Sequence, residues 1–259
     1  MAWTDAAGNF WLFGGFGADS SGAEDYLNDL WKYSAGQWTW ISGSNLRDQN
    51  GTYGTQGTAA PNNVPGSRSQ SVSWIDASGN FWLFAGVGYG ASGSEDGLND
   101  LWKYSAGEWT WISGSNMIDQ AETYGILGIA SPNNVPGARE GGVGWTDAAG
   151  NLWLFGGSGF NDLWKYSTGE WTWMGGSNAG DPTPTYGTLG TAAPGNLPGG
   201  RTDPIVWTDA SGNVWLFGGT PKVKVAMRVP SMIYGSTNLQ GSARIQIDLP
   251  RTPLNATQI

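Results

Sequence analysis

The sequence predicts an all-β fold built from about three and a half copies of one four-stranded antiparallel sheet. The first observation is a repeat: all 17 tryptophans recur at matching places, and Trp3, Trp74 and Trp145 are spaced by 71 residues, with Trp207 following after 62. The second is short apolar segments with the period of strands. The third is the 43 glycines, many of them in the short turns between these segments. A fixed period of this kind decides the architecture before any local feature does.

The first two strands of a unit are predicted from a hairpin pattern, which is complete in the second unit. Residues 69–76 alternate large with small side chains, as in a strand with one buried face. The turn at 77–80 contains Gly and Asn, which accept positive φ. The apolar run at 81–84 predicts a strand buried on both faces, which Gly86 is expected to end. Other units carry a glycine pair there, which predicts a close backbone approach or a sharp exit.

The last two strands of a unit are predicted from a second hairpin pattern. Residues 98–104 alternate in period 2, residues 105–107 form a short turn, and residues 108–112 are rich in Trp, Thr and Ile. Each unit is therefore four antiparallel strands with tight turns after the first and third. Because strand directions alternate, the long loops after the second and fourth strands must emerge at the same end of the sheets.

This unit resembles the kelch repeat, a β-propeller blade also typical of the central domain of galactose-oxidase-like proteins. The resemblance rests on the Gly-Gly after the second strand, on Asn-Asp-Leu-Trp-Lys-Tyr in the third strand, and on the Trp of the fourth. It covers residues 1–219, with units starting near residues 1, 68, 139 and 201. The period is longer than the ~50 residues typical of kelch, and the turn before the fourth strand is tighter. The resemblance implies a kelch-type β-propeller with an incomplete, open ring, because closure needs about four to eight blades.

The repeat pattern is incomplete at both ends of the sequence. Met1 aligns with Val72 and Val143, so we expect a start inside a longer gene. Residues 220–259 lose Trp and gain Lys, Arg, Met and Pro, and we interpret this tail as a frameshifted remnant of the fourth blade. The alternative is a divergent capping segment with its own strand at 243–249.

Composition narrows the classes of function. A net charge of −9 disfavours nucleic acid and anionic lipid partners. The chain has no Cys and no His, so it lacks thiol chemistry, the commonest general base, and the ligands of the copper site in galactose-oxidase-type propellers. No apolar run approaches the ~18 residues of a membrane span. We expect no cofactor, no metal and no catalytic residue. The compartment is not fixed; an export signal in a longer gene would favour an extracellular or periplasmic location.

Repeated charged residues are interpreted as structural, because identical residues in every unit serve blade geometry. One set of aspartates precedes the first turn of each unit, and a second lies in the third strand: Asp5, Asp76, Asp147 and Asp209, then Asp29, Asp100 and Asp162. Turn capping and backbone hydrogen bonds are preferred over a ring of acids at the propeller centre. Three arginines begin the first strands and are expected to pair with acids of a neighbouring blade: Arg68, Arg139 and Arg201.

Five loop residues are the candidate ligand contacts. Tyr53, Tyr124 and Tyr186 recur in the loops after the fourth strands, and Asp25 and Asp96 lie in the loops after the second strands. Tyrosine on a rigid scaffold suits sugar or peptide contact. The alternatives are that each Tyr anchors its own loop and that the acidic loops are solvated or bind calcium.

The predicted function is a non-catalytic scaffold that recognises a protein or a glycan through long loops on one face. One alternative is a propeller domain of a larger carbohydrate-active or oxidase-like enzyme whose catalytic residues lie outside this chain. Another is an adhesive cell-surface repeat protein. The end blades are also expected to self-associate, because they expose sheet faces that neighbours would otherwise cover.

Overall fold

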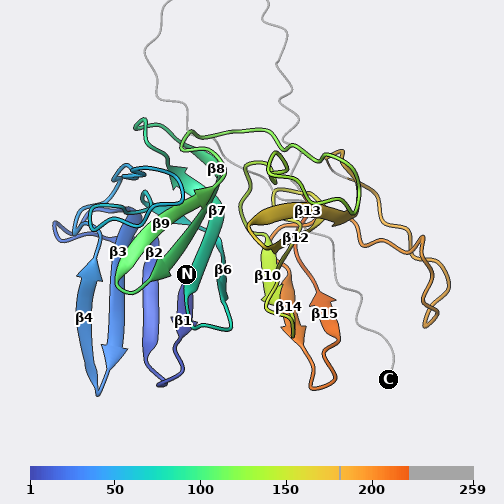
Figure 1. The fold of residues 1–259 in the computed structure, drawn as a ribbon, viewed down its shortest axis with the longest axis horizontal. Helices are drawn as coiled ribbons and strands as arrows, with labels where there is room; N and C mark the ends of the chain where they lie inside the picture. The colour runs from blue at the N-terminus through green and yellow to red at the C-terminus, as the bar shows by residue number, and fades with distance from the viewer. Residues whose placement is uncertain (181, 222–259) are drawn as a thin grey trace, which may run out of the picture. The chain divides into compact units, whose positions relative to one another are not determined.

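The computed structural model describes residues 1–180 and 182–221, and all regular structure within them is β (Figure 1). The first sheet contains β1 (Ala2–Thr4), β2 (Phe10–Ala18), β3 (Glu24–Ser34) and β4 (Gln37–Ser42). The second contains β5 (Arg68–Ser69), β6 (Val72–Ile75), β7 (Phe81–Tyr89), β8 (Glu95–Ser105) and β9 (Glu108–Ser113). The third contains β10 (Val143–Thr146), β11 (Leu152–Phe155), β12 (Leu163–Ser167) and β13 (Glu170–Gly175). A two-stranded fourth sheet contains β14 (Ile205–Thr208) and β15 (Val214–Phe217).

Each sheet is an antiparallel meander in chain order, which confirms the predicted fold class. In the second sheet the first strand is split, so that both β5 and β6 pair with β7. Figure 1 shows β1 with β2 and β3 with β4 joined by short turns at the same end of the first sheet. The described residues thus supply three complete blades and the first hairpin of a fourth.

The second strand is longer than predicted in the first two units. The expectation that Gly86 ends it is wrong, because β7 continues to Tyr89. Ala85 has a φ of 60°, and this left-handed residue forms a bulge after which pairing resumes at Gly86 opposite Leu98. The third strands accordingly begin early, so Asp25 and Asp96 lie on β3 and β8 rather than in loops.

The aspartate before each first turn is a capping residue, as predicted. Asp5 accepts hydrogen bonds from the backbone N–H groups of Ala7 and Asn9 and from the indole of Trp11. The same arrangement recurs at Asp76, Asp147 and Asp209. These carboxylates are therefore used inside their own hairpins.

Aromatic side chains hold successive sheets face to face. In the first interface, Phe13 of β2 packs edge-on against Trp109 of β9 with ring centroids 5.3 Å apart. The equivalent pair in the next interface, Phe84 with Trp171, has the same 5.3 Å separation. The first strands also touch in sequence order, β1 with β6, β6 with β10, and β10 with β14. The repeat therefore reproduces one packing interface rather than several different ones.

The glycine position after the second strand permits the predicted close backbone approach. Gly86, with a φ of 100°, donates its N–H to the carbonyl of Arg139 in the next unit at 2.8 Å. Gly157 donates in the same way to Arg201 at 3.0 Å. These bonds tie each blade to the start of the following one.

The interpretation of residues 220–259 as a frameshifted remnant concerns residues outside the described part of the chain, apart from Thr220 and Pro221. The same holds for the strand expected at 243–249. The division into repeat units and tail stays a prediction.

The capping geometry predicts an unusually acidic carboxyl at Asp209. Hydrogen bonds from Trp215 and then Asn213 lower the pKa of Asp209 to about 2. Because this folded pKa lies below the ordinary ~3.9, the stabilisation is present above pH ~4 and is lost as the pH falls through about 2. In NMR spectra, the indole N–H resonance of Trp215 should keep its shift to about pH 3 and move only near pH 2. A midpoint near pH 4 contradicts the geometry, and Asp209→Asn should abolish the titration.

Candidate functional site

A buried ion pair lies at the centre of the second unit. Arg68 and Asp100 are both fully buried, and their side chains meet through two hydrogen bonds of 2.6 and 2.7 Å. Arg68 also donates to the carbonyls of Gly66 and Ala85. Burial alone would lower the pKa of Arg68, but the charge and hydrogen bonds of Asp100 raise it above its ordinary value. The Arg68 guanidinium therefore stays charged in this ion pair.

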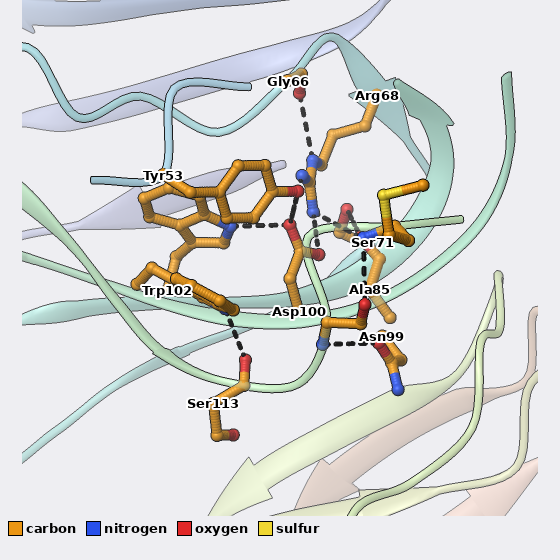
Figure 2. A network of polar contacts seen from close by, with 12 residues as sticks. Tyr53, Gly66, Arg68, Ser71, Ala85, Asn99, Asp100, Trp102 and Ser113 are labelled. Atoms are coloured by element: carbon orange, nitrogen blue, oxygen red, sulfur yellow. Dashed lines mark hydrogen bonds and ion pairs between the residues drawn. The ribbon is translucent and has the colours of Figure 1, made fainter. Parts of the chain in front are cut away.

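Tyr53 and Trp102 complete this network, as Figure 2 shows. The Tyr53 hydroxyl and the Trp102 indole each donate to Oδ2 of Asp100 at 2.7 Å. Burial, followed by the charge of Asp100, raises the pKa of Tyr53 above its ordinary value, so the phenol stays protonated and donates. We call this set of Arg, Asp, Tyr and Trp the clamp. It ties the first strand, the third strand and the preceding long loop to one another.

The clamp recurs in the third unit. Arg139 pairs with Asp162 at 2.7 Å, and Tyr124 donates to the same carboxylate at 3.0 Å. Trp164 donates its indole N–H at 2.8 Å. Arg68 and Arg139 therefore pair within their own units, so the expected pairing with a neighbouring blade is wrong for both, and no described carboxylate pairs with Arg201. The second strand lies between the first and the third, and each guanidinium reaches across it, because Arg68 also donates to the carbonyl of Ala85 and Arg139 to that of Gly156.

The three candidate tyrosines lie in two different environments. Tyr53 is buried and Tyr124 half-buried, and both hydroxyls are held by clamp aspartates. Such contacts are expected if each tyrosine anchors its own loop, which is the alternative to ligand contact. Tyr186 is exposed. Ligand contact by the tyrosines stays a prediction, with Tyr186 the member of the set that is accessible.

A cavity of about 810 Å³ opens where residues at one end of the second, third and fourth units meet. Asp96 at the start of β8 lies in its wall, together with residues that follow β9, precede β10 and follow β11. This arrangement bears out the expectation that the long loops share one end of the sheets. We call that end the loop face and this space the acidic cavity, because five carboxylates line it: Asp96, Asp119, Glu122, Glu140 and Asp203.

The cavity wall is built partly from positions at which the units differ. Gln70, Gly141 and Asp203 occupy the same repeat position, two residues after the clamp arginine. All three are left-handed, with φ of 55°, 62° and 53°. Their backbones form a chain across the units, because Gly141 N–H donates to the Gln70 carbonyl and Asp203 N–H to the Gly141 carbonyl. The Gln70 amide then reaches the Asp203 carboxylate at 3.2 Å.

Sequence reasoning missed Gln70, Glu140 and Asp203 as site residues. The predicted candidates were residues that recur, whereas these three occupy positions at which the units differ. The available signal was the change from Gln to Gly to Asp directly after the repeated arginine. A search for such breaks in the repeat could have found it.

Asp25 and Asp96 occupy equivalent positions but are not brought together. Asp25 forms an ion pair with Arg47 at 3.3 Å, and Arg47 also meets Asp48 at 3.2 Å. In the second unit Ile118 stands where the first has Arg47, so the acidic cavity keeps its negative charge at Asp96. Ligand contact at Asp25 would have to compete with this arginine.

The described residues hold no group of three or more acidic side chains placed to bind a metal ion. The same part of the chain contains no helix with the length and apolar character to cross a bilayer. The acidic cavity offers carboxylates, side-chain amides and hydroxyls for hydrogen bonding and charge attraction.

Comparison with known proteins gives fold neighbours alone. No protein-family model matches the chain, and no curated protein matches its sequence. Among solved structures, "Structure of YjhT" is similar over 81% of this chain and 56% of that one, at 13% identity and a TM-score of 0.47. A fungal alcohol oxidase of the AA5 family, solved in complex with copper, is similar over 66% of this chain and 29% of its own, at 15% identity and a TM-score of 0.37. The chain thus spans about half and under a third of these two proteins. Its own sheets define the class, an all-β protein of the β-propeller type with an incomplete set of blades.

The clamp predicts a large loss of stability when one charge is removed. Asp162→Asn leaves Arg139 buried without a counter-charge and should lower the free energy of unfolding by about 3–5 kcal/mol. The matched control is Asp29→Asn in the first unit, where Asp29 is half-buried and accepts a hydrogen bond from Trp31 but no described arginine pairs with it. This control should cost about 1 kcal/mol or less. Urea unfolding in dilute solution measures the free energy of unfolding of both variants. Equal losses in the two variants would show that the buried ion pair is not the source of the stability.

Proposed function

We propose that this chain is a non-catalytic scaffold of kelch-type propeller blades that recognises a protein or glycan through its loop face. The observation that supports this most directly is the acidic cavity. Its wall combines residues that differ between units, such as Gln70 and Asp203, with the repeated Asp96 and Asp119, whereas the repeated aspartates of the third strands and first turns are occupied by the clamp and the turn caps. A scaffold with a constant frame and variable loops is the arrangement used by binding proteins.

The lining of the acidic cavity favours a positively charged ligand. Five carboxylates line it and no Lys or Arg does, in a chain of net charge −9. Carboxylates concentrated in a concave wall strengthen the local field and attract cationic groups. A basic segment of a protein is therefore the favoured occupant. Sugar hydroxyls could also donate to these oxygens, with Gln70, Gln120 and Ser158 as further polar partners.

A second candidate is a domain that positions substrate in a larger carbohydrate-active or oxidase-like enzyme. The observation in its favour is the asymmetry of Gln70, Gly141 and Asp203, because catalytic sites break the symmetry of a repeat. The catalytic residues would lie outside this chain. Fold alone does not decide between the two candidates.

The proposed function predicts binding of a basic peptide at the loop face. A fluorescent octalysine peptide should bind, and Asp96→Asn with Asp203→Asn should weaken that binding by about tenfold, equivalent to ~1.4 kcal/mol. The matched control is Glu108→Gln with Glu170→Gln, which removes the same charge near the tight turns at the opposite end of the sheets. Fluorescence anisotropy at two salt concentrations measures the effect, which should diminish at high salt.

Three outcomes are informative. Equal weakening by both double variants would mean attraction to net charge alone and would overturn recognition at the acidic cavity. Binding of neutral oligosaccharides in preference to the peptide, lost in Asp96→Asn with Asp203→Asn, would identify a glycan as the occupant. No binding of either probe would contradict the proposal that this cavity recognises ligands of these two classes.

A further inference from the structure

Another cavity lies between the second and third units, at the end of the sheets that carries the tight turns. It has a volume of about 410 Å³ and is lined by the turns that join β10 to β11 and β12 to β13. Its walls also include Trp82 of β7, Leu152 of β11 and Tyr166 of β12. Pockets that bind small molecules have volumes of about 300–1,000 Å³. We call this cavity the turn pocket.

The equivalent place between the first and second units is filled by an aromatic ring of the protein itself. Phe81 stands there in place of Leu152. Its ring stacks on Trp3 at 5.2 Å and on Tyr104 at 6.1 Å, with interplanar angles of 14° and 10°. Trp11 meets the same ring edge-on at 5.1 Å. Three aromatic side chains therefore contact one phenyl ring in this interface.

The second interface keeps two of these aromatic neighbours but not the central ring. Trp82 and Tyr166 occupy the positions of the edge-on tryptophan and the stacked tyrosine, and their ring centroids lie 5.6 Å apart. Leu152 replaces the phenylalanine. Because leucine is shorter than phenylalanine, the space that the outer part of the phenyl ring takes in the first interface stays open.

A second sequence difference changes the packing of the remaining tryptophan. Trp74 corresponds to Trp3, the tryptophan that stacks on the central ring of the first interface. It packs against Gly144, where a Cβ atom would collide with its indole, whereas the equivalent residue of the second unit is Ser73. Trp74 donates its indole N–H to Trp153 on a second strand, whereas Trp3 donates to Trp74 on a first strand. Trp74 consequently does not line the turn pocket.

Polar groups line the rest of the turn pocket. The Lys103 ammonium lies 5.5 Å from the centre of the Trp82 ring, and no described carboxylate forms an ion pair with it. Asp76 also lines the pocket, but its oxygens already accept hydrogen bonds from its own turn and from the Trp82 indole. The lysine disfavours a cationic ligand, and the net charge of −9 disfavours an anionic one. A neutral ligand is therefore favoured.

We propose that the turn pocket binds one aromatic ring of the phenol class, as a free small molecule or as a tyrosine side chain of another protein. The ring takes the place that Phe81 fills in the first interface, where it stacks on Tyr166 and meets Trp82 edge-on. Its hydroxyl group hydrogen-bonds with the hydroxyls of Ser167 and Thr168, which also line the pocket. This site lies at the opposite end of the sheets from the acidic cavity and does not depend on the function proposed for it.

Nitrogen-15 NMR of the indole N–H groups tests the site in the unaltered chain. Trp82 donates its indole N–H to Asp76 at the turn pocket, and Trp11 donates to Asp5 at the filled place of the first interface. p-Cresol should shift the Trp82 resonance in a saturable titration and leave the Trp11 resonance unshifted. 4-Methylcyclohexanol, which has a similar size without a planar ring, should bind about tenfold more weakly. Equal shifts of both tryptophans, no shift, or equal binding of the two probes overturns the proposal.

Filling the turn pocket provides the second test. Leu152→Phe supplies the ring that the first interface contains and should abolish the saturable shift of Trp82 by p-cresol. The matched control is Val214→Phe, which adds a ring at the same repeat position of the fourth unit, outside the pocket, and should leave the dissociation constant unchanged. Binding of p-cresol to Leu152→Phe as tight as to the unaltered chain overturns the proposal.

The reverse conversion keeps the test informative if Leu152→Phe does not fold. Phe81→Leu with Ser73→Gly gives the first interface both sequence differences of the second, so p-cresol should then shift the Trp11 resonance as well. A Trp11 resonance that stays unshifted overturns the account of why the turn pocket is open.

A tyrosine peptide identifies the source of the ring. Acetyl-Gly-Tyr-Gly amide carries the same phenol on a peptide backbone, and its dissociation constant is measured from the same Trp82 shift. A constant below that of p-cresol supports a protein side chain as the occupant. A higher constant supports a free phenol, because the turns that line the pocket then exclude the peptide backbone.

Discussion

The buried ion pair between the first-strand arginine and the third-strand aspartate is the interaction on which the blades of the second and third units depend. Removing two charges from water is costly unless their hydrogen-bonding groups are satisfied. Arg68 meets this condition with two bonds to Asp100 and two to backbone carbonyls. Because the carbonyls belong to residues before the first strand and at the second, one guanidinium fixes three chain segments. The Tyr53 hydroxyl adds the preceding long loop.

This constraint separates what must repeat from what is free to vary. Clamp, turn cap and interface aromatics recur because each unit needs the same internal contacts. The residue two positions after the arginine takes no part in these contacts, and it differs between units: it is Gln70, Gly141 or Asp203, of which Gln70 and Asp203 line the cavity. The clamp therefore holds the loops in fixed positions, and side chains that differ between units lie close together at the loop face.

The sequence allowed the fold to be predicted further than the site. The 71-residue spacing of Trp3, Trp74 and Trp145 predicted the blades, and the alternation at 98–104 predicted the third strand. The bulge at Ala85 was not predicted, because an alanine with positive φ has no sequence signature of its own. The ion-pair partner of Arg68 was also not predicted. The sequence offers an aspartate in the same unit and one in the next, and choosing between them requires the positions of the strands within and between the sheets. The acidic cavity was not predicted, because it is assembled from several loops that belong to three units.

Hydrogen exchange at arginine side chains tests the central role of the ion pair most directly. Nitrogen-15 NMR of the arginine Nε–H groups resolves each guanidinium without altering the protein. Arg68 and Arg139, both buried and fully bonded, should exchange orders of magnitude more slowly than Arg47, whose side chain is 41% exposed. Exchange of Arg68 and Arg139 as fast as that of Arg47 would show that water reaches the ion pairs, and would contradict the claim that this interaction holds the second and third blades together.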